Sequence, residues 1–227
     1  MPASSKRPNP PFPRLDFAPP AVKATRRPDG SHLLASGHPL GDYPRCLGDM
    51  LVARASESPD RTFLAERDAS GGWRRIGFGE AHNAVRALGQ AVLDAGCDAG
   101  RTVAILSGNS IDHALLTFAA MHVGVPAAPV SVAYSLMSQD FAKLIHCVRQ
   151  VTPRLLYVED GAPYGKALAS LKDAGLLDGV VVVVGKNAPA GLDTVSFARL
   201  AATRPTAAVD RAFAAISPYT IGKILFT

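Results

Sequence analysis

The segment TVAILSGNSIDHALLTFAAMHVGVPAAPV, residues 102–130, places two short apolar runs on either side of a longer apolar stretch. Residues 102–106 and 126–130 have the length and bulk of buried strands. Residues 111–123 are apolar nearly all round, which predicts a helix buried in the interior. A strand, a helix and a second strand in this order are typical of a parallel β-α-β unit. The segment therefore predicts an α/β fold.

The same alternation continues on both sides of this unit. An amphipathic helix is expected at residues 78–95, with Ala81, Val85, Leu88 and Val92 on its apolar face. Further strands are expected at 155–158 and 180–184, and further helices after the capping residue Ser138 and at 164–174. Four strands separated by helices predict a largely parallel, doubly wound sheet flanked by helices. After Gly185 the pattern weakens to a helix at 196–202, a linker at 203–209 and a final strand at 220–227.

The N-terminal third has a different pattern. Residues 1–21 are rich in proline and basic side chains, and we expect a disordered arm there. A small β-hairpin is predicted around Pro28-Asp29-Gly30, within a hairpin and linker at residues 22–42. A helix is expected at 46–56 and a second hairpin around Gly71-Gly72. Residues 43–227 are then expected to form one α/β domain.

Composition narrows the classes of function. The chain has 227 residues, 48% of them hydrophobic and 19% charged, with a net charge of +5. No run reaches the ~18 apolar residues of a membrane span, and an aromatic content of 7% without basic interleaving argues against a nucleic-acid surface. Three widely spaced cysteines fit neither a disulfide framework nor a zinc cluster and suggest a cytoplasmic protein. We expect no nucleic-acid partner and no membrane partner.

Several residues could take part in binding or catalysis, and each of them could instead have a purely structural role. The Ser107–Ser110 loop could hold a phosphate at a helix N-terminus, or it could be a turn with Asn109 or Ser110 as the helix cap. Glu159-Asp160 could serve a metal or form a solvated turn, and Trp73 reads as a packing anchor rather than a stacking platform. His122 and His146 read as core or interface histidines with satisfied hydrogen bonds. No dinucleotide fingerprint, phosphate-loop motif or nucleophile elbow is present. The residues thus indicate no self-contained active site.

Four segments resemble the N-terminal portion of the AMP-forming acyl-CoA synthetases, a family of adenylate-forming ligases. Residues 75–81, RIGFGEA, are similar to the strand and helix start that open the family's domain. Residues 103–110, VAILSGNS, resemble its Val-Ala-Ile-x-x-x-Asn-Ser segment. Residues 121–130 resemble its glycine and proline-containing strand, and residues 223–227, KILFT, resemble the strand that enters its phosphate loop. Because the four segments occur in the family's order and spacing, the resemblance extends over residues 43–227.

Within this family, residues 107–115 and 128–140 look most like feruloyl-CoA synthetases, which activate hydroxycinnamic acids. The resemblance implies a ligase that joins a carboxylate to ATP, releases pyrophosphate and then forms a thioester with CoA. It implies ATP, Mg²⁺ and CoA as cofactors and a small aromatic acid as substrate of the parent enzyme. Thr227 matches the first residue of the phosphate loop, and we assign no catalytic residue and no metal ligand.

The family's later loop and its Thr-Glu metal segment have no match in this sequence. We therefore expect an N-terminal fragment, truncated before the phosphate loop, that is inactive alone and binds no cofactor tightly. One alternative is a non-catalytic binding or interaction module derived from the same fold. Another is an unrelated doubly wound enzyme that binds a nucleotide at Ser107–Ser110.

Overall fold

The structure is a computed structural model that describes residues 16–17, 19–68 and 70–226. Contacts divide the chain into two units, Met1–Tyr43 and Pro44–Thr227. In the first unit, β1 (Val22–Arg26) and β2 (His32–Ser36) pair antiparallel, and every residue of both strands is exposed. Gly30, with a φ of +85°, supplies the left-handed turn between them, so the first predicted hairpin is confirmed. Most of the predicted arm at residues 1–21, and also Thr227, lie outside the described residues.

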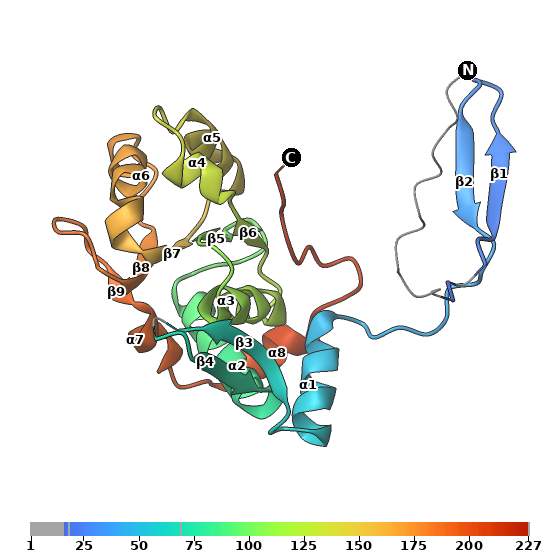
Figure 1. Ribbon diagram of the computed structural model, residues 1–227, viewed down its shortest axis with the longest axis horizontal. Coiled ribbons are helices and arrows are strands. Elements are labelled where there is room, and N and C mark those ends of the chain that lie inside the picture. Colours follow the sequence, from blue (N-terminus) through green and yellow to red (C-terminus); the bar gives the residue numbers. More distant parts are fainter. Residues whose placement is uncertain (1–15, 18, 69, 227) are drawn as a thin grey trace, which may run out of the picture. The chain divides into compact units, whose positions relative to one another are not determined.

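The second unit is built on a parallel sheet with the strand order β6-β5-β7-β8-β9 (Figure 1). Its strands are β5 (Val103–Leu106), β6 (Ala127–Pro129), β7 (Leu155–Asp160), β8 (Val181–Lys186) and β9 (Val195–Ser196). The first four are the strands that the sequence predicts. The two-residue β9, which extends the sheet beside β8, was not predicted.

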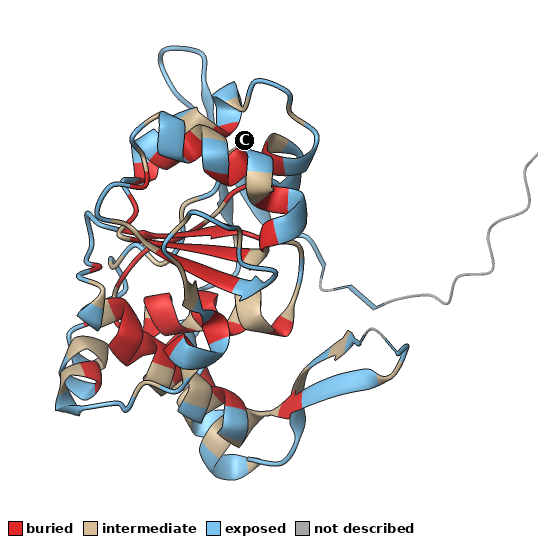
Figure 2. Cartoon of the chain, turned by 90° about the vertical axis from the view of Figure 1, so that its left-hand side faces the viewer, coloured by how far each residue is buried: buried red, intermediate tan, exposed pale blue. Residues whose placement is uncertain are grey.

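Helices cover both faces of this sheet and form two cores, as Figure 2 shows. The helices are α1 (Leu47–Glu57), α2 (Phe78–Asp94), α3 (Ile111–His122), α4 (Val132–Leu136), α5 (Ala142–Val151), α6 (Gly161–Asp173), α7 (Phe197–Ala201) and α8 (Ala207–Ala214). Successive strand residues point to opposite faces. Ile105 and Tyr157 therefore pack with α2 and α3, whereas Leu106 and Leu156 pack with α5 and α6. The doubly wound α/β prediction is confirmed.

A second hairpin, formed by β3 (Thr62–Arg67) and β4 (Trp73–Gly77), lies next to α2 and α3. Phe63 contributes to the first core by packing against Phe78 and Phe118, with ring centroids 4.7 and 5.5 Å away. Trp73 does not pack in that core, because half of it is exposed. The guanidinium of Arg67 lies 4.1 Å from its ring centroid. Trp73 therefore packs within the hairpin rather than in the core.

Residues 203–209, predicted to be a linker, contain the start of helix α8. Thr206 caps this helix, and both its N–H (2.9 Å) and its hydroxyl (2.7 Å) donate to Oε1 of Gln90 on α2. Val209 is fully buried, and Arg45 donates to the carbonyls of Phe213 and Ile216 at the helix end. These partners are distant in sequence, so local pattern could not indicate the helix.

The predicted final strand at 220–227 is reduced to one parallel bridge between Lys223 and Ala127 of β6. The N–H of Ala127 donates to the carbonyl of Gly222 (3.1 Å), and the N–H of Ile224 donates to the carbonyl of Ala127 (2.9 Å). Two residues further along β6, the next donor in this ladder would be the N–H of residue 129, which is a proline and has none. Pro129 thus accounts for the short pairing.

Two glycines of α6 provide a matched test of how this helix packs against the segment that follows β8. A Cβ on Gly161 would lie 2.2 Å from the backbone oxygen of Asn187, whereas a Cβ on Gly165 would meet no atom within 4 Å. We expect Gly161→Ala to lower the free energy of unfolding by about 1–3 kcal/mol. Gly165→Ala should raise it by about 0.5–1 kcal/mol, because alanine is the better helix former. Urea denaturation of both variants checks this, and equal changes in the two would contradict it.

Candidate functional site

The candidate site lies at the carboxyl ends of the parallel strands. β6, the next strand in the chain after β5, pairs with one edge of β5, and the following strand, β7, pairs with its other edge. The direction of winding therefore reverses between β5 and β7. Ligands of doubly wound sheets bind beyond the strand ends at such a point. A cavity of about 490 Å³ is found there, lined by residues that include Asn109, Ser110, Asp112, Tyr157, Glu159 and Lys186.

The Ser107–Ser110 loop, which the sequence offered as a phosphate site or as a turn, forms one wall of this crevice. Ser110 is the N-cap of α3, and its Oγ accepts the N–H of His113 at 3.1 Å. Oε2 of Glu159 accepts from the hydroxyl of Ser107 and the N–H of Gly108, both at 3.2 Å. The loop is thus a capped turn whose glycine amide is already bonded.

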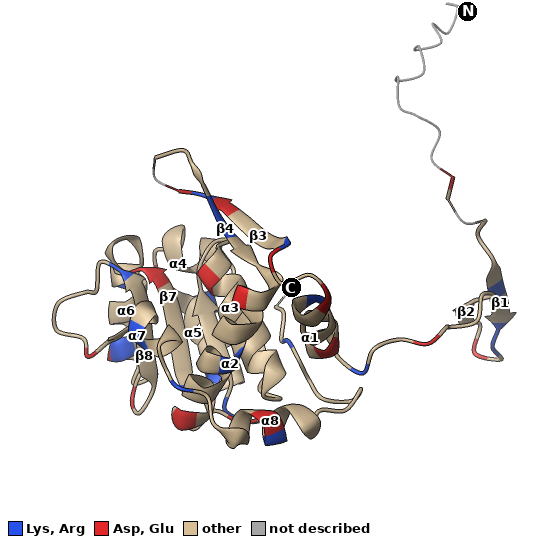
Figure 3. Cartoon of the chain, turned by 90° about the horizontal axis from the view of Figure 1, so that it is seen from below, with Lys and Arg blue, Asp and Glu red and all other residues tan. Residues whose placement is uncertain are grey.

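Glu66 of β3 occupies the N-terminus of α3. Its Oε2 accepts the N–H of Ile111 at 2.7 Å, and its Oε1 pairs with Arg74 at 2.9 Å. The second nitrogen of Arg74 reaches Asp112 at 2.9 Å. Figure 3 colours both acidic and basic residues on the β3–β4 hairpin. A carboxylate at this position uses the favourable end of the helix dipole that an external phosphate would need.

Two of the backbone amides that could hold a phosphate of ATP at this crevice are therefore already bonded, although Arg67, Arg74 and Lys186 also line it. The amides of Gly108 and Ile111 already donate to Glu159 and Glu66, and a phosphate placed there would meet two carboxylates. The phosphate-binding candidate from the sequence, Thr227, lies outside the described residues. Within the described part of the chain, no three His, Cys, Asp or Glu side chains cluster closely enough to hold a metal ion.

Tyr157 is a site residue that sequence reasoning missed, because it sits within the apolar run that marks β7. Only 1% of it is exposed, yet its side chain lines the crevice. Burial raises the pKa of its phenol, so the hydroxyl remains protonated and can donate at neutral pH. Glu159, which precedes the cap of α6, is the other polar group on this strand that faces the crevice.

The second carboxylate of the Glu159-Asp160 pair is structural. Oδ1 of Asp160 accepts from the N–H of Ala162 at 3.0 Å and caps α6, and it also accepts from Nδ2 of Asn187 at 2.9 Å. These bonds, led by the one from Asn187, lower the pKa of Asp160. The pair is therefore neither a metal site nor a freely solvated turn.

The two histidines that the sequence assigned to the core or an interface behave differently. His146 is exposed on α5. His122 is 2% exposed at the end of α3, and neither of its ring nitrogens has a hydrogen-bond partner among the described residues. The core position predicted for His122 is confirmed, but the prediction that its hydrogen bonds are satisfied is wrong. His146 does not lie in the core. Burial lowers the pKa of His122 to about 4, so the ring is neutral near pH 7.

Comparison with known proteins identifies the family. A family model described as "AMP-binding enzyme" matches residues 51–222, so this chain belongs to the AMP-binding enzyme family. A search of curated proteins found no match.

Solved structures share the fold. A putative long-chain-fatty-acid CoA ligase from Rhodopseudomonas palustris is 21% identical with a TM-score of 0.57, over 70% of this chain and 37% of its own. A luciferase-like enzyme from the mealworm Zophobas morio is 18% identical with a TM-score of 0.58, over 80% of this chain and 38% of its own. The anthranilate CoA ligase AuaEII, in complex with anthranoyl-AMP, is 20% identical with a TM-score of 0.57, over 73% of this chain and 28% of its own. The chain thus spans well under half of these proteins, and at these identities the likeness shows the fold.

None of the helices in the described residues is both long and apolar enough to span a membrane.

Proposed function

We propose that the chain is the first portion of an ATP-dependent aromatic acid–CoA ligase of the feruloyl-CoA synthetase type. The observation that carries this is the family match over residues 51–222, at the place where the sequence also resembles those synthetases. The parent enzyme would convert a hydroxycinnamic acid and ATP to an acyl-adenylate and pyrophosphate, and would then form the thioester with CoA. Mg²⁺ would accompany ATP, and both substrates suit a cytoplasmic enzyme. A CoA ligase for another aromatic acid, anthranilate, has the same fold.

Taken alone, the 227 residues should be inactive. The crevice at the strand ends presents carboxylates where phosphates would bind, and no catalytic residue of the family has a match here. Residues 44–226 would instead provide the scaffold from which a phosphate loop follows Thr227. The aromatic acid pocket and the metal segment would come from later parts of the parent enzyme.

The test compares two proteins in an assay of ferulate-dependent AMP formation. One is the 227-residue chain, and the other is the chain extended by the reading frame that follows codon 227. We expect activity with ferulate, ATP, Mg²⁺ and CoA only from the extended protein, and less with a long-chain fatty acid. An extended protein that prefers fatty acids would refute the aromatic assignment. Activity of the short chain would refute the assignment as an inactive fragment.

The alternative, a non-catalytic module, is favoured by one observation: both hydrophobic cores are built from residues of the second unit. A stop codon after Thr227, together with a native protein of the short mass, would support this alternative and refute the ligase proposal for this chain.

A further inference from the structure

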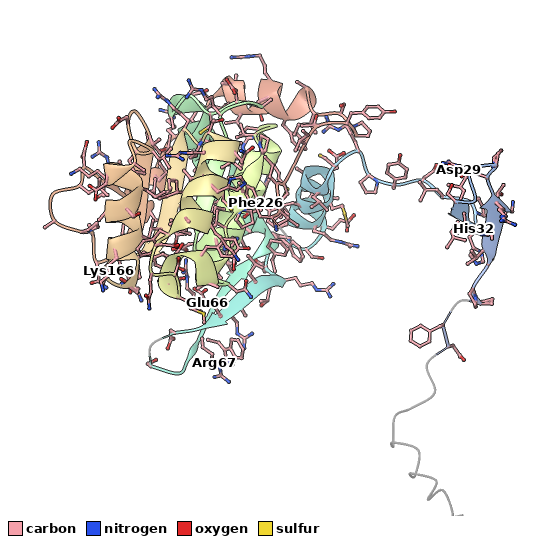
Figure 4. The ribbon with its side chains drawn as sticks, turned by 90° about the horizontal axis from the view of Figure 1, so that it is seen from above. Asp29, His32, Glu66, Arg67, Lys166 and Phe226 are labelled. Atoms are coloured by element: carbon pink, nitrogen blue, oxygen red, sulfur yellow. The ribbon has the colours of Figure 1, made fainter. Side chains whose placement is uncertain are left out.

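The β1–β2 hairpin, with Asp29 in its turn and His32 at the start of β2 (Figure 4), has no other strand or helix to pack on among the described residues of the first unit. Every residue of both strands is exposed, Val22 by 64% and Leu34 by 66%. A lone two-stranded hairpin is marginally stable in water, and three or more strands are needed for independent stability. Additional strands would therefore stabilise this hairpin.

The hydrogen bonds between β1 and β2 determine which backbone groups face outward. At one end the N–H of Gly37 donates to the carbonyl of Ala21 at 2.6 Å, and at the other the N–H of Arg27 donates to the carbonyl of Ser31 at 2.8 Å. Bonded and non-bonded pairs alternate in an antiparallel ladder, so residues 33 and 35 bond to β1. The N–H and C=O groups that point away from β1 are then those of His32, Leu34 and Ser36.

The two free edges of the hairpin differ in charge. β1 carries Lys23 and Arg26, whereas β2 contains no Lys, Arg, Asp or Glu. Charged side chains on an edge strand, lysine above all, discourage pairing with a further strand. Two copies that paired through β1 would bring four positive charges into one junction, whereas a junction of two β2 strands contains no Lys or Arg. β2 is therefore the edge to which a second copy can add.

The sequence of β2 is complementary to itself when two copies run antiparallel. With Leu34 of one copy opposite Leu34 of the other, the outward groups of residues 32 and 36 also meet. Ala24 pairs with Leu34 inside each hairpin, so the two leucines are flanked by alanines on one face of the sheet. On the other face, Leu33 of each copy lies opposite Ala35 of the other. Apolar cross-strand pairs of this kind stabilise antiparallel sheets.

From these observations we propose that two copies of this chain associate through the free edge of β2 and form a four-stranded antiparallel sheet in the order β1-β2-β2-β1. Both copies use the same strand, so the contact has twofold symmetry and closes at a dimer. It gives hydrogen-bond partners to the outward groups of β2 and supplies the strands that the lone hairpin lacks. The proposal concerns the first unit and does not rest on the proposed ligase function.

Sedimentation velocity and amide hydrogen exchange on the 227-residue chain test the proposal. Because five-residue strands bury a small area, we expect a reversible dimer with a Kd of about 10–100 µM. At ~0.5 mM protein, the amides of His32, Leu34 and Ser36 should exchange more slowly than in dilute solution. The outward amides of residues 22, 24 and 26 on β1 should remain fast at both concentrations.

Leu34→Lys tests the junction, and Ala24→Lys is its matched control. The two residues are cross-strand partners, both are exposed, and each variant adds one positive charge. In the proposed sheet, Leu34→Lys places two like charges directly opposite each other and should raise the Kd at least about tenfold. The charges added by Ala24→Lys are three strand spacings apart, ~14 Å, and are largely screened by salt. That variant should change the Kd less than about threefold.

A chain that stays monomeric up to ~0.5 mM would overturn the proposal, whether the hairpin is free, packs on its own chain or takes a different partner. A dimer whose Kd responds equally to Leu34→Lys and Ala24→Lys, or to neither, would also overturn it, because the contact would lie elsewhere. Slow exchange of the outward amides of β1 in place of those of β2 would refute pairing through β2. None of these results bears on the ligase proposal, which is tested by the activity of the extended protein.

Discussion

Replacing Leu116 with alanine is expected to lower the free energy of unfolding by about 2–5 kcal/mol. Leu116 lies on α3 with no exposed surface, in the core formed between the sheet and α2. The lost transfer free energy of its side chain adds to the cost of the cavity left behind. Since α2 and α3 have the most extensive contact of any two elements, little relaxation is available to fill that space.

The matched control is Leu136→Ala at the end of α4, where 43% of the side chain is exposed. This change should cost less than about 1 kcal/mol. Urea unfolding followed by circular dichroism measures both. Similar losses in the two variants would mean that α3 is not packed as the structure has it.

The sheet was predictable because its signal is local. The strands β5, β7 and β8 are short apolar runs bounded by turns, and α2 shows its apolar face at helical spacing. Burial on both faces of a parallel sheet removes the alternation of polar residues, which leaves continuous runs that are easy to recognise. Where this signal was weak, as in α8 and β9, contacts made by distant residues determine the structure.

The candidate site was predictable only as a place, the carboxyl ends of the strands. Its chemistry depends on pairs that are far apart in sequence: Glu66 bonds to Ile111, and Glu159 bonds to Gly108. These carboxylates change the loop from a possible phosphate cradle to a capped turn. No local motif shows that a glutamate 45 residues earlier reaches the helix start. A cavity lined by Leu64, Thr117 and Lys223 depends in the same way on β3, α3 and the last described segment together.

His122 should make the fold sensitive to mild acid. It stacks on Phe213 at 4.1 Å between ring centroids, and His82 approaches it edge-on at 6.0 Å. Arg86, Arg45 and Asp210 are the charged groups around it. Burial is the main cause that lowers its pKa to about 4, and the neighbouring positive charges of His82 and Arg86 act in the same direction. Asp210 opposes them but is itself paired with Arg86.

The sign of the effect follows from proton binding. The pKa of His122 is about 4 in the folded chain and about 6.5 when unfolded, so between these values only the unfolded chain binds the proton. Its contribution to stability is complete above pH ~6.5 and is lost as the pH falls toward 4, at ~1.4 kcal/mol per pH unit. The total loss from this residue is about 3 kcal/mol. Urea denaturation at a series of pH values from 7.5 to 4.5 measures it.

The variant His122→Leu should remove most of this slope and leave the stability at pH 7.5 nearly unchanged, because an apolar side chain replaces a ring that has no hydrogen bonds. His82→Leu should remove a smaller part, since His82 is half-buried and its pKa is lowered less strongly by burial. If the slope of His122→Leu equals that of the unchanged chain, His122 gains a partner or water on folding and the acid sensitivity arises elsewhere. A slope removed by His122→Leu but not by His82→Leu would assign the acid sensitivity to the ring that stacks on Phe213 at the junction of α3 and α8.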